Sequence, residues 1–334
     1  MAKTGTESKR GSNFANDFCI NFQGSKFYET YKKHKDELII GVRDGYINLY
    51  YNCASIAKIK SGKRGIVKKA EINDYYLKNG SKKGNKYVSI SEDDFVKHYE
   101  HIKAQSDAKV NLEKKSQERL VIDNNTNQNS NWYCLDVEYM KSINGKMQPW
   151  RFDIIAISKT APYRIALIEL KYGFNAIGGE SGVQKHVLDY SNFKNDNSFD
   201  KYLKCEIVNM LKMQKKLGVI NFPKCFENID KDDIEINNSP EFYFITLDNN
   251  SAEGGNTPKM SMGGYLFGKK GQWGSRIVSS KAVMAEQNVK NIKPIFLFST
   301  ATLDKKGRLT KLINDILDEK NYDSVEKIDW SIYH

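Results

Sequence analysis

Two acidic residues and one lysine stand in apolar, strand-like segments where charge is unusual. Asp153 lies early in the segment RFDIIAIS, and Glu169 and Lys171 lie at the end of IALIELK, separated by one residue. Charged groups are costly to bury unless they are paired or bind a metal ion. Two carboxylates are suitable ligands for Mg²⁺, and a neighbouring lysine can stabilise charge on a phosphate. These residue types therefore indicate metal-dependent hydrolysis of a phosphodiester bond.

The three side chains meet only if two strands position them. In a strand, residues i and i+2 project from one face, so Glu169 and Lys171 are neighbours and Leu170 faces the opposite layer. If this strand pairs antiparallel with the strand that carries Asp153, the start of one lies opposite the end of the other. Two carboxylates and a lysine then converge at one edge of the sheet. The alternatives are a solvated Asp153 near a turn and a surface neighbour pair of Glu169 and Lys171.

The order of the surrounding segments predicts an α/β fold with a mixed central sheet flanked by helices. Helical composition follows an N-cap at Ser91, continues to about Leu120 and is followed by a turn-forming loop at 123–131. The glycine-rich segment 249–274 is either a lid near the substrate or a surface loop. The predicted strands are 132–140, 150–158, 163–173, 241–248 and 292–300, and the later predicted helices are 183–193, 200–216, 280–290 and 309–318.

Positive charge is concentrated at the start of the chain. Residues 1–90 contain 18 Lys and Arg against 8 Asp and Glu, whereas the rest of the chain contains 34 against 33. The Asp44-Gly45 turn between alternating apolar segments predicts a β-hairpin, and the segment 61–65, SGKRG, fits a basic hairpin tip rather than a phosphate-binding loop. We therefore predict a small basic β-rich module at 1–90 and an α/β domain at 91–334. The basic excess indicates contact with nucleic acid, and a solvated basic surface is the alternative.

Composition limits the class of protein. Hydrophobic residues make up 40% of the chain and aromatic residues 12%, which is enough for a substantial core. The polar N-terminus lacks the apolar run of a signal peptide, and no segment approaches the ~18 apolar residues of a membrane span. The five cysteines are scattered without a CxxC pair, which argues against a zinc knuckle or a disulfide framework. These features predict a soluble cytoplasmic protein without a membrane partner.

Asp153, followed at a strand end by Glu169 and Lys171, resembles the PD-(D/E)XK motif of the restriction-endonuclease-like superfamily. Phe152 stands where the motif has Pro, a common departure in this divergent group. The superfamily core is a helix, three strands, a helix and a strand, which corresponds to the order predicted for about residues 105–248. The resemblance covers under half of the chain.

The resemblance implies roles for individual residues. Asp153 and Glu169 would be ligands of Mg²⁺ or Mn²⁺, and Lys171 would be the catalytic cation. Members often carry a metal-binding glutamate on the first helix, and Glu113 is preferred here over Glu118 as this auxiliary ligand.

Further candidates come from the helix after the third strand and from the first strand. Gln184 and Tyr190 resemble the Gln and Tyr of that helix in the superfamily, although their spacing is wider, and Gln184 is either a helper near the site or an ordinary polar residue. His186 and Asp189 are interpreted as a helix-surface pair rather than as substrate contacts. The first-strand residues Asp136 and Glu138 either extend the acidic cluster or face solvent.

By resemblance, the expected activity is that of a metal-dependent nuclease acting on DNA rather than RNA, with bacterial restriction or defence as an analogous role. Many members act as dimers, so a homodimer is implied, although no segment is identified as its interface. The main alternative is a catalytically silent nucleic-acid-binding protein with a nuclease-like fold. A third hypothesis is an α/β scaffold without nuclease activity, in which the ExK spacing is accidental.

Overall fold

The computed structural model describes residues 9–77, 86–109, 111–173, 176, 182–230, 234–248 and 292–327. The predicted helix 280–290 and the glycine-rich segment 249–274 lie outside these residues. The described helices and strands are α1 (Phe18–Gln23), α2 (Lys26–Lys33), β1 (Ile39–Val42), β2 (Tyr46–Tyr51), β3 (Ala54–Lys60), β4 (Lys69–Asn73), β5 (Tyr87–Ser91), α3 (Glu92–Asp107), α4 (Leu112–Thr126), β6 (Trp132–Ile143), β7 (Lys146–Ser158), β8 (Ile165–Tyr172), α5 (Val183–Asn195), α6 (Lys204–Leu217), β9 (Glu241–Leu247), β10 (Ile295–Phe298) and β11 (Ser324–Lys327).

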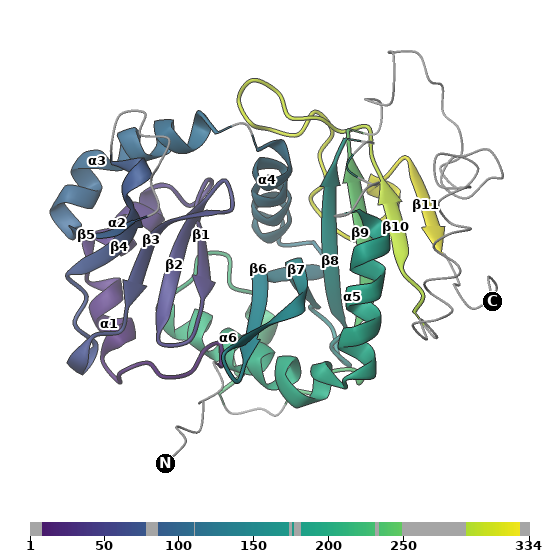
Figure 1. Cartoon of the computed structure of the whole chain (residues 1–334), viewed down its shortest axis with the longest axis horizontal. Coiled ribbons are helices and arrows are strands. Elements are labelled where there is room, and N and C mark those ends of the chain that lie inside the picture. Colours follow the sequence, from purple (N-terminus) through teal and green to yellow (C-terminus); the bar gives the residue numbers. More distant parts are fainter. Residues whose placement is uncertain are drawn as a thin grey trace.

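The N-terminal strands β1 to β5 form an antiparallel sheet in sequential order. The hairpin predicted at Asp44-Gly45 is confirmed by the pairing of β1 with β2, and Gly45 adopts a φ of 69° that a side chain would strain. Helix α3, which follows residue 90 in the chain, packs on α2 and β5 and so covers this sheet (Figure 1). The division of the chain at residue 90 stays a prediction.

A second, six-stranded sheet has the order β11-β10-β9-β8-β7-β6. Strand β9 pairs parallel with β8 and with β10, whereas the other neighbours pair antiparallel. The predicted α/β class with a mixed sheet is therefore confirmed. Seven of the eight residues of β8 are buried, as expected for a strand with layers on both faces.

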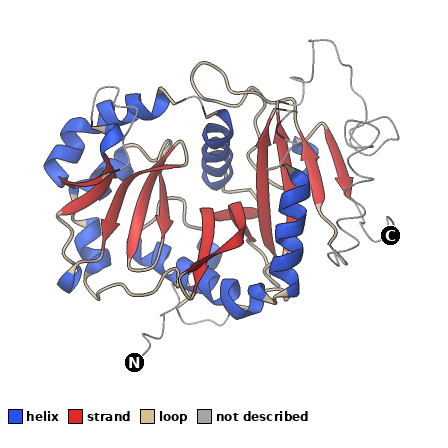
Figure 2. Ribbon diagram, viewed as in Figure 1, coloured by secondary structure: helices blue, strands red, loops and turns tan. Residues whose placement is uncertain are grey.

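Helices cover both faces of the six-stranded sheet. Leu120 of α4 and Ile168 of β8 belong to one buried cluster, and Val187 of α5 and Leu167 of β8 belong to the other. Figure 2 shows α4 standing between the two sheets. Helix α6 contacts α1, β1 and β6 and thereby connects the two halves of the molecule. None of the helices within the described ranges is long and apolar enough to cross a membrane.

The prediction of a helix at 309–318 is wrong, because the chain there is irregular, with bends and one short turn. The Asp315 carboxylate accepts hydrogen bonds from the backbone and side chain of Asn131, and the Ile316 N–H donates to the side chain of Asn124. These contacts with α4 and with the loop after it outweigh the local helix propensity. Asn124 itself lies in the last turns of α4, so the loop predicted at 123–131 begins later than expected.

Candidate functional site

Strands β7 and β8 separate at Asp153, and this separation shapes the site. Their last paired residues are Ile154 and Ile168, so the next step of the register sets Asp153 opposite Glu169. The Leu170 backbone N–H donates a 2.8 Å hydrogen bond to Oδ2 of Asp153. The Asp153 carboxylate thus accepts a hydrogen bond from a backbone N–H group of β8 that would bond to the backbone of β7 if the two strands stayed paired. The predicted antiparallel pairing is confirmed, and it brings the two carboxylates together.

Glu169 and Lys171 form a buried ion pair at the end of β8. Their residues are only 3% and 5% exposed, and Nζ of Lys171 lies 2.6 Å from Oε1 of Glu169. Leu170 belongs to the hydrophobic cluster of the opposite face, whereas Leu167 belongs to the cluster under α5. The prediction that Glu169 and Lys171 share one face is confirmed. The alternative of a solvent-exposed surface pair is wrong.

Helix α5 adds His186, which lies with its Nε2 atom 2.8 Å from Oε1 of Glu169. The interpretation of His186 and Asp189 as a helix-surface pair is therefore wrong. Asp189 is buried and its ion-pair partner is Lys185, at 3.4 Å. The four-residue spacing between His186 and the buried Tyr190 places both on one helical face. That spacing could have indicated from the sequence that His186 points toward the sheet.

A cavity of about 440 Å³ opens beside these groups. Its lining combines four carboxylates with the basic side chains of Arg151, Lys171 and Lys185. Such a mixture can bind a cation together with an anionic substrate. The lining residues are Glu113, Glu138, Tyr139, Met140, Arg151, Phe152, Asp153, Glu169, Lys171, Ala176, Lys185 and His186.

The two candidate glutamates of α4 point to different places. Glu113, in the first turn, lines the cavity. Glu118 is buried on the other side, where its carboxylate accepts hydrogen bonds from the backbone N–H groups of Asn52 and Cys53. Glu113 is therefore the α4 glutamate placed at the site, and Glu118 fastens the turn between β2 and β3.

The Gln and Tyr of α5 do not add a described polar group to the cavity. Gln184 lies in the first turn of α5, but its side chain is outside the described part of the structure. Tyr190 is fully buried, with its ring stacked on Phe242. Within the described residues, its hydroxyl has no hydrogen-bond partner. Tyr190 thus belongs to the packing between α5 and the sheet.

Asp136 and Glu138 have separate roles, although residues two positions apart in a strand usually project from the same face. Glu138 has a φ of 54°, and β6 is irregular near Asp136, so the usual alternation of side chains is broken. Glu138 lines the cavity and extends the acidic cluster. Asp136 is instead buried between Arg10, at 2.6 Å, and Arg43, at 2.7 Å. Asp136 therefore neither faces solvent nor joins the cluster.

Burial and crowding of charge alter the pKa values of the cluster. Burial raises the pKa of Glu169 to about 7, although Lys171 opposes the shift. Burial and the negative charges of Glu169 and Glu138 raise the pKa of Asp153 well above its usual range. Burial and the charge of Lys171 lower the pKa of His186 to about 4, so its imidazole is neutral at pH 7. The pKa of Lys171 is raised, because the nearby carboxylates outweigh its burial.

The donor set fits a hard divalent cation with few protein ligands. Among the described residues, no three His, Cys, Asp or Glu side chains are gathered closely enough to hold a metal ion. Mg²⁺ commonly takes only one or two carboxylates and completes its shell with waters and substrate phosphates. Asp153 and Glu169 suit this role, because the charge of a bound cation would offset the cost of burying two carboxylates and the repulsion that raise both of their pKa values.

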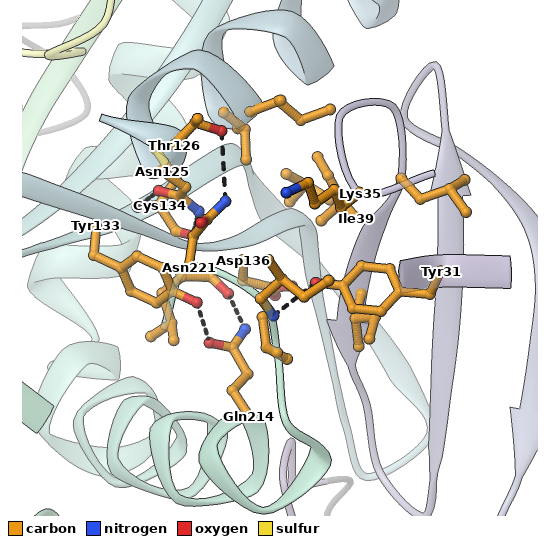
Figure 3. A pocket seen from close by; sticks show the side chains of 18 residues that line it. Tyr31, Lys35, Ile39, Asn125, Thr126, Tyr133, Cys134, Asp136, Gln214 and Asn221 are labelled. Atoms are coloured by element: carbon orange, nitrogen blue, oxygen red, sulfur yellow. Dashed lines mark hydrogen bonds between the residues drawn. The ribbon is translucent and has the colours of Figure 1, made fainter. Parts of the chain in front are cut away.

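A second hollow, of about 40 Å³, lies between the two sheets and is much smaller than the cavity beside Glu169 (Figure 3). The side chain of Gln214 accepts a hydrogen bond from the Tyr133 hydroxyl and donates one to the Leu135 carbonyl there. The volume suits a few water molecules. The hollow is a small gap where the two halves of the protein meet.

No family model, curated protein or solved structure matches this chain. Its function is therefore inferred from the geometry and the charge of the cavity.

Proposed function

We propose that this protein is a Mg²⁺- or Mn²⁺-dependent nuclease that hydrolyses phosphodiester bonds, with DNA as the favoured substrate. The observation that carries the proposal is the position of Asp153 opposite Glu169 where β7 and β8 separate, with Lys171 buried against Glu169. Two carboxylates and a lysine converge there on one cavity that is large enough to admit a phosphate group.

The order of the elements supports membership of the restriction-endonuclease-like superfamily. Helix α4 is followed by the antiparallel strands β6, β7 and β8, then by α5 and α6, and then by β9, which pairs parallel with β8. This order agrees with a core of helix, three strands, helix and strand, with α6 as one additional helix. The preference for DNA and a role in bacterial restriction or defence come from this likeness alone.

In the proposed mechanism, Asp153 and Glu169 would hold the divalent cation directly, and Glu113, which lines the same cavity, would be an auxiliary ligand in its outer shell. When bound, the cation would act as a Lewis acid towards the phosphate and would lower the pKa of a water molecule. Lys171 keeps its positive charge in the buried site and stabilises negative charge as it grows on the phosphate. Arg151 and Lys185 line the same cavity and attract the phosphates of the substrate.

The direct test is incubation of the protein with labelled double-stranded DNA, single-stranded DNA and RNA in the presence of Mg²⁺ or Mn²⁺. We expect cleavage of DNA that stops when EDTA removes the metal, because the carboxylates alone cannot neutralise the phosphate. Denaturing electrophoresis of end-labelled substrates measures the products. Tight, salt-sensitive binding without cleavage of any substrate would favour the catalytically silent alternative. Neither binding nor cleavage would favour the scaffold hypothesis.

The exposed basic segment of the N-terminal sheet is the proposed contact with the DNA backbone. We call residues 60–69 the basic loop; its five cations are exposed, and it contains no acidic residue. The loop is anchored, because the side chain of Asn21 in α1 donates a 3.0 Å hydrogen bond to the Gly65 carbonyl. Its basic residues are Lys60, Lys63, Arg64, Lys68 and Lys69.

Replacing Lys63 and Arg64 together with glutamine should weaken binding to all DNA sequences to a similar extent. Each lost phosphate contact should reduce the slope of log affinity against log salt by about 0.9, so the pair should reduce it by roughly two. Fluorescence anisotropy over a range of salt concentrations measures this slope. Lys32 and Lys33 of α2 are also exposed, and their double glutamine variant is the control. Equal slopes for the two variants would argue against contact by the basic loop.

A further inference from the structure

The carboxylate of Glu169 is held by two groups that reach the same oxygen from different elements. Nζ of Lys171, two residues along β8, lies 2.6 Å from Oε1, and Nε2 of His186, from α5, lies 2.8 Å from Oε1. Both contacts restrict rotation of the Glu169 carboxylate about the Cγ–Cδ bond. Because both of these contacts converge on Oε1, neither of them occupies the second oxygen, Oε2.

We propose that His186 is a positioning residue that fixes the Glu169 carboxylate so that Oε2 is available to the divalent cation. The inference rests on the proposed function, since it concerns the same metal site. Hydrogen-bonded partners of ligating carboxylates orient the ligand, and their loss typically weakens metal binding by about 10- to 100-fold. His186 lines the cavity itself, so it is close enough to serve this purpose.

Packing of α5 does not require this histidine. Val183, Val187, Tyr190 and Phe193 of the same helix are buried to 1% exposure or less and attach it to the sheet. His186 remains partly exposed, and within the described residues its Nδ1 atom has no hydrogen-bond partner. Its described polar contact is therefore directed at Glu169, as expected of a residue that serves the site rather than the core.

Two amide substitutions separate orientation of Glu169 from a general effect on folding. In His186→Gln, the side-chain amide nitrogen can reach the position of Nε2 and still donate to Oε1. In His186→Asn, the amide reaches only as far as Nδ1 and cannot make that contact. Both variants are neutral and polar, so they differ mainly in the atom that meets Glu169.

Calorimetric titration with Mn²⁺, without nucleic acid, measures the effect of each substitution on metal affinity separately from its effect on catalysis. We expect His186→Asn to bind Mn²⁺ about 10- to 100-fold more weakly than the parent, and His186→Gln to recover most of that loss. The control His98→Asn, at an exposed position of α3, should bind as the parent does. Circular dichroism of each variant checks that it is folded.

The outcomes distinguish this inference from the proposed function. If the parent protein does not bind Mn²⁺, the proposed metal site itself is wrong. If the parent binds Mn²⁺ and Asp153→Asn does not, the metal site stands. Equal affinities of the parent and both His186 variants in that case would overturn the positioning role. Equal weakening by Asn and Gln would also overturn it, because the effect would not depend on an atom that reaches Glu169.

Discussion

Replacing Lys171 with alanine should lower the rate of Mg²⁺-dependent DNA cleavage by about 100- to 1,000-fold. Lys171 is nearly fully buried, retains its charge and lies in the cavity where the phosphate would bind. Its removal takes away the cation closest to Glu169 and so allows burial to raise the pKa of Glu169 further. A more protonated Glu169 is a poorer metal ligand, so both consequences slow the reaction. Initial rates at saturating substrate measure the change.

The matched control is Lys185→Ala. Lys185 lines the same cavity, but its side chain is about half exposed and pairs with Asp189 rather than with Glu169. We expect this control to weaken substrate binding more than the maximal rate, because an exposed cation attracts DNA without touching the carboxylates. Parallel purification of both variants also detects contaminating nuclease. A Lys171→Ala protein as fast as the parent would show that cleavage takes place elsewhere.

Replacing Asp136 with asparagine should lower the free energy of unfolding by about 3–5 kcal/mol. Asp136 is buried between the guanidinium groups of Arg10 and Arg43, which are themselves buried. Asparagine keeps the shape but removes the charge, so two buried cations lose their counter-ion. Because Arg43 directly follows β1 of the N-terminal sheet and Asp136 belongs to β6, the contact between the two sheets should weaken as well. Denaturation in urea, followed by circular dichroism, measures the change.

Asp93→Asn provides the comparison for this stability prediction. Asp93 forms an ion pair with Lys26, but both side chains are exposed to solvent. Exposed pairs usually contribute less than about 1 kcal/mol. The two substitutions therefore remove the same charge from the same residue type in different surroundings. Similar unfolding midpoints for the two variants would contradict a stabilising role for the buried arginines.

Strand geometry explains why part of the site could be predicted from sequence. The one-residue spacing of Glu169 and Lys171 in an apolar strand implies one shared face, since the alternation of side chains is a local property. The turn between the strands of Asp153 and Glu169 is short, which favours antiparallel pairing of neighbours. The structure has both features. The order of helices and strands between residue 91 and β9 was equally accessible, because it depends on local periodicity.

Contacts between distant residues explain what sequence patterns missed. His186 and Glu169 meet because α5 packs back over β8, and no periodicity within either segment specifies that crossing. Asp136 pairs with Arg10 and Arg43, which lie 126 and 93 positions away. The segment 309–318 has helical composition, yet its Asp315 side chain binds the loop after α4 and its Ile316 backbone N–H binds Asn124 of α4 instead. In each case the position of the side chain depends on a contact between residues far apart in the sequence.

The sequence by itself therefore determined the α/β class, the order of the central elements and the shared face of Glu169 and Lys171, since these follow from local spacing; the meeting of Asp153 with them also required the pairing of β7 with β8. Tertiary structure alone decided that β7 and β8 part at Asp153, that His186 reaches the Oε1 atom of Glu169, and that Asp136 is withdrawn from the acidic cluster. The physical reason is that burial and charge pairing depend on which surfaces pack together in the folded chain. The periodicity of a sequence segment does not specify which distant residues it will contact.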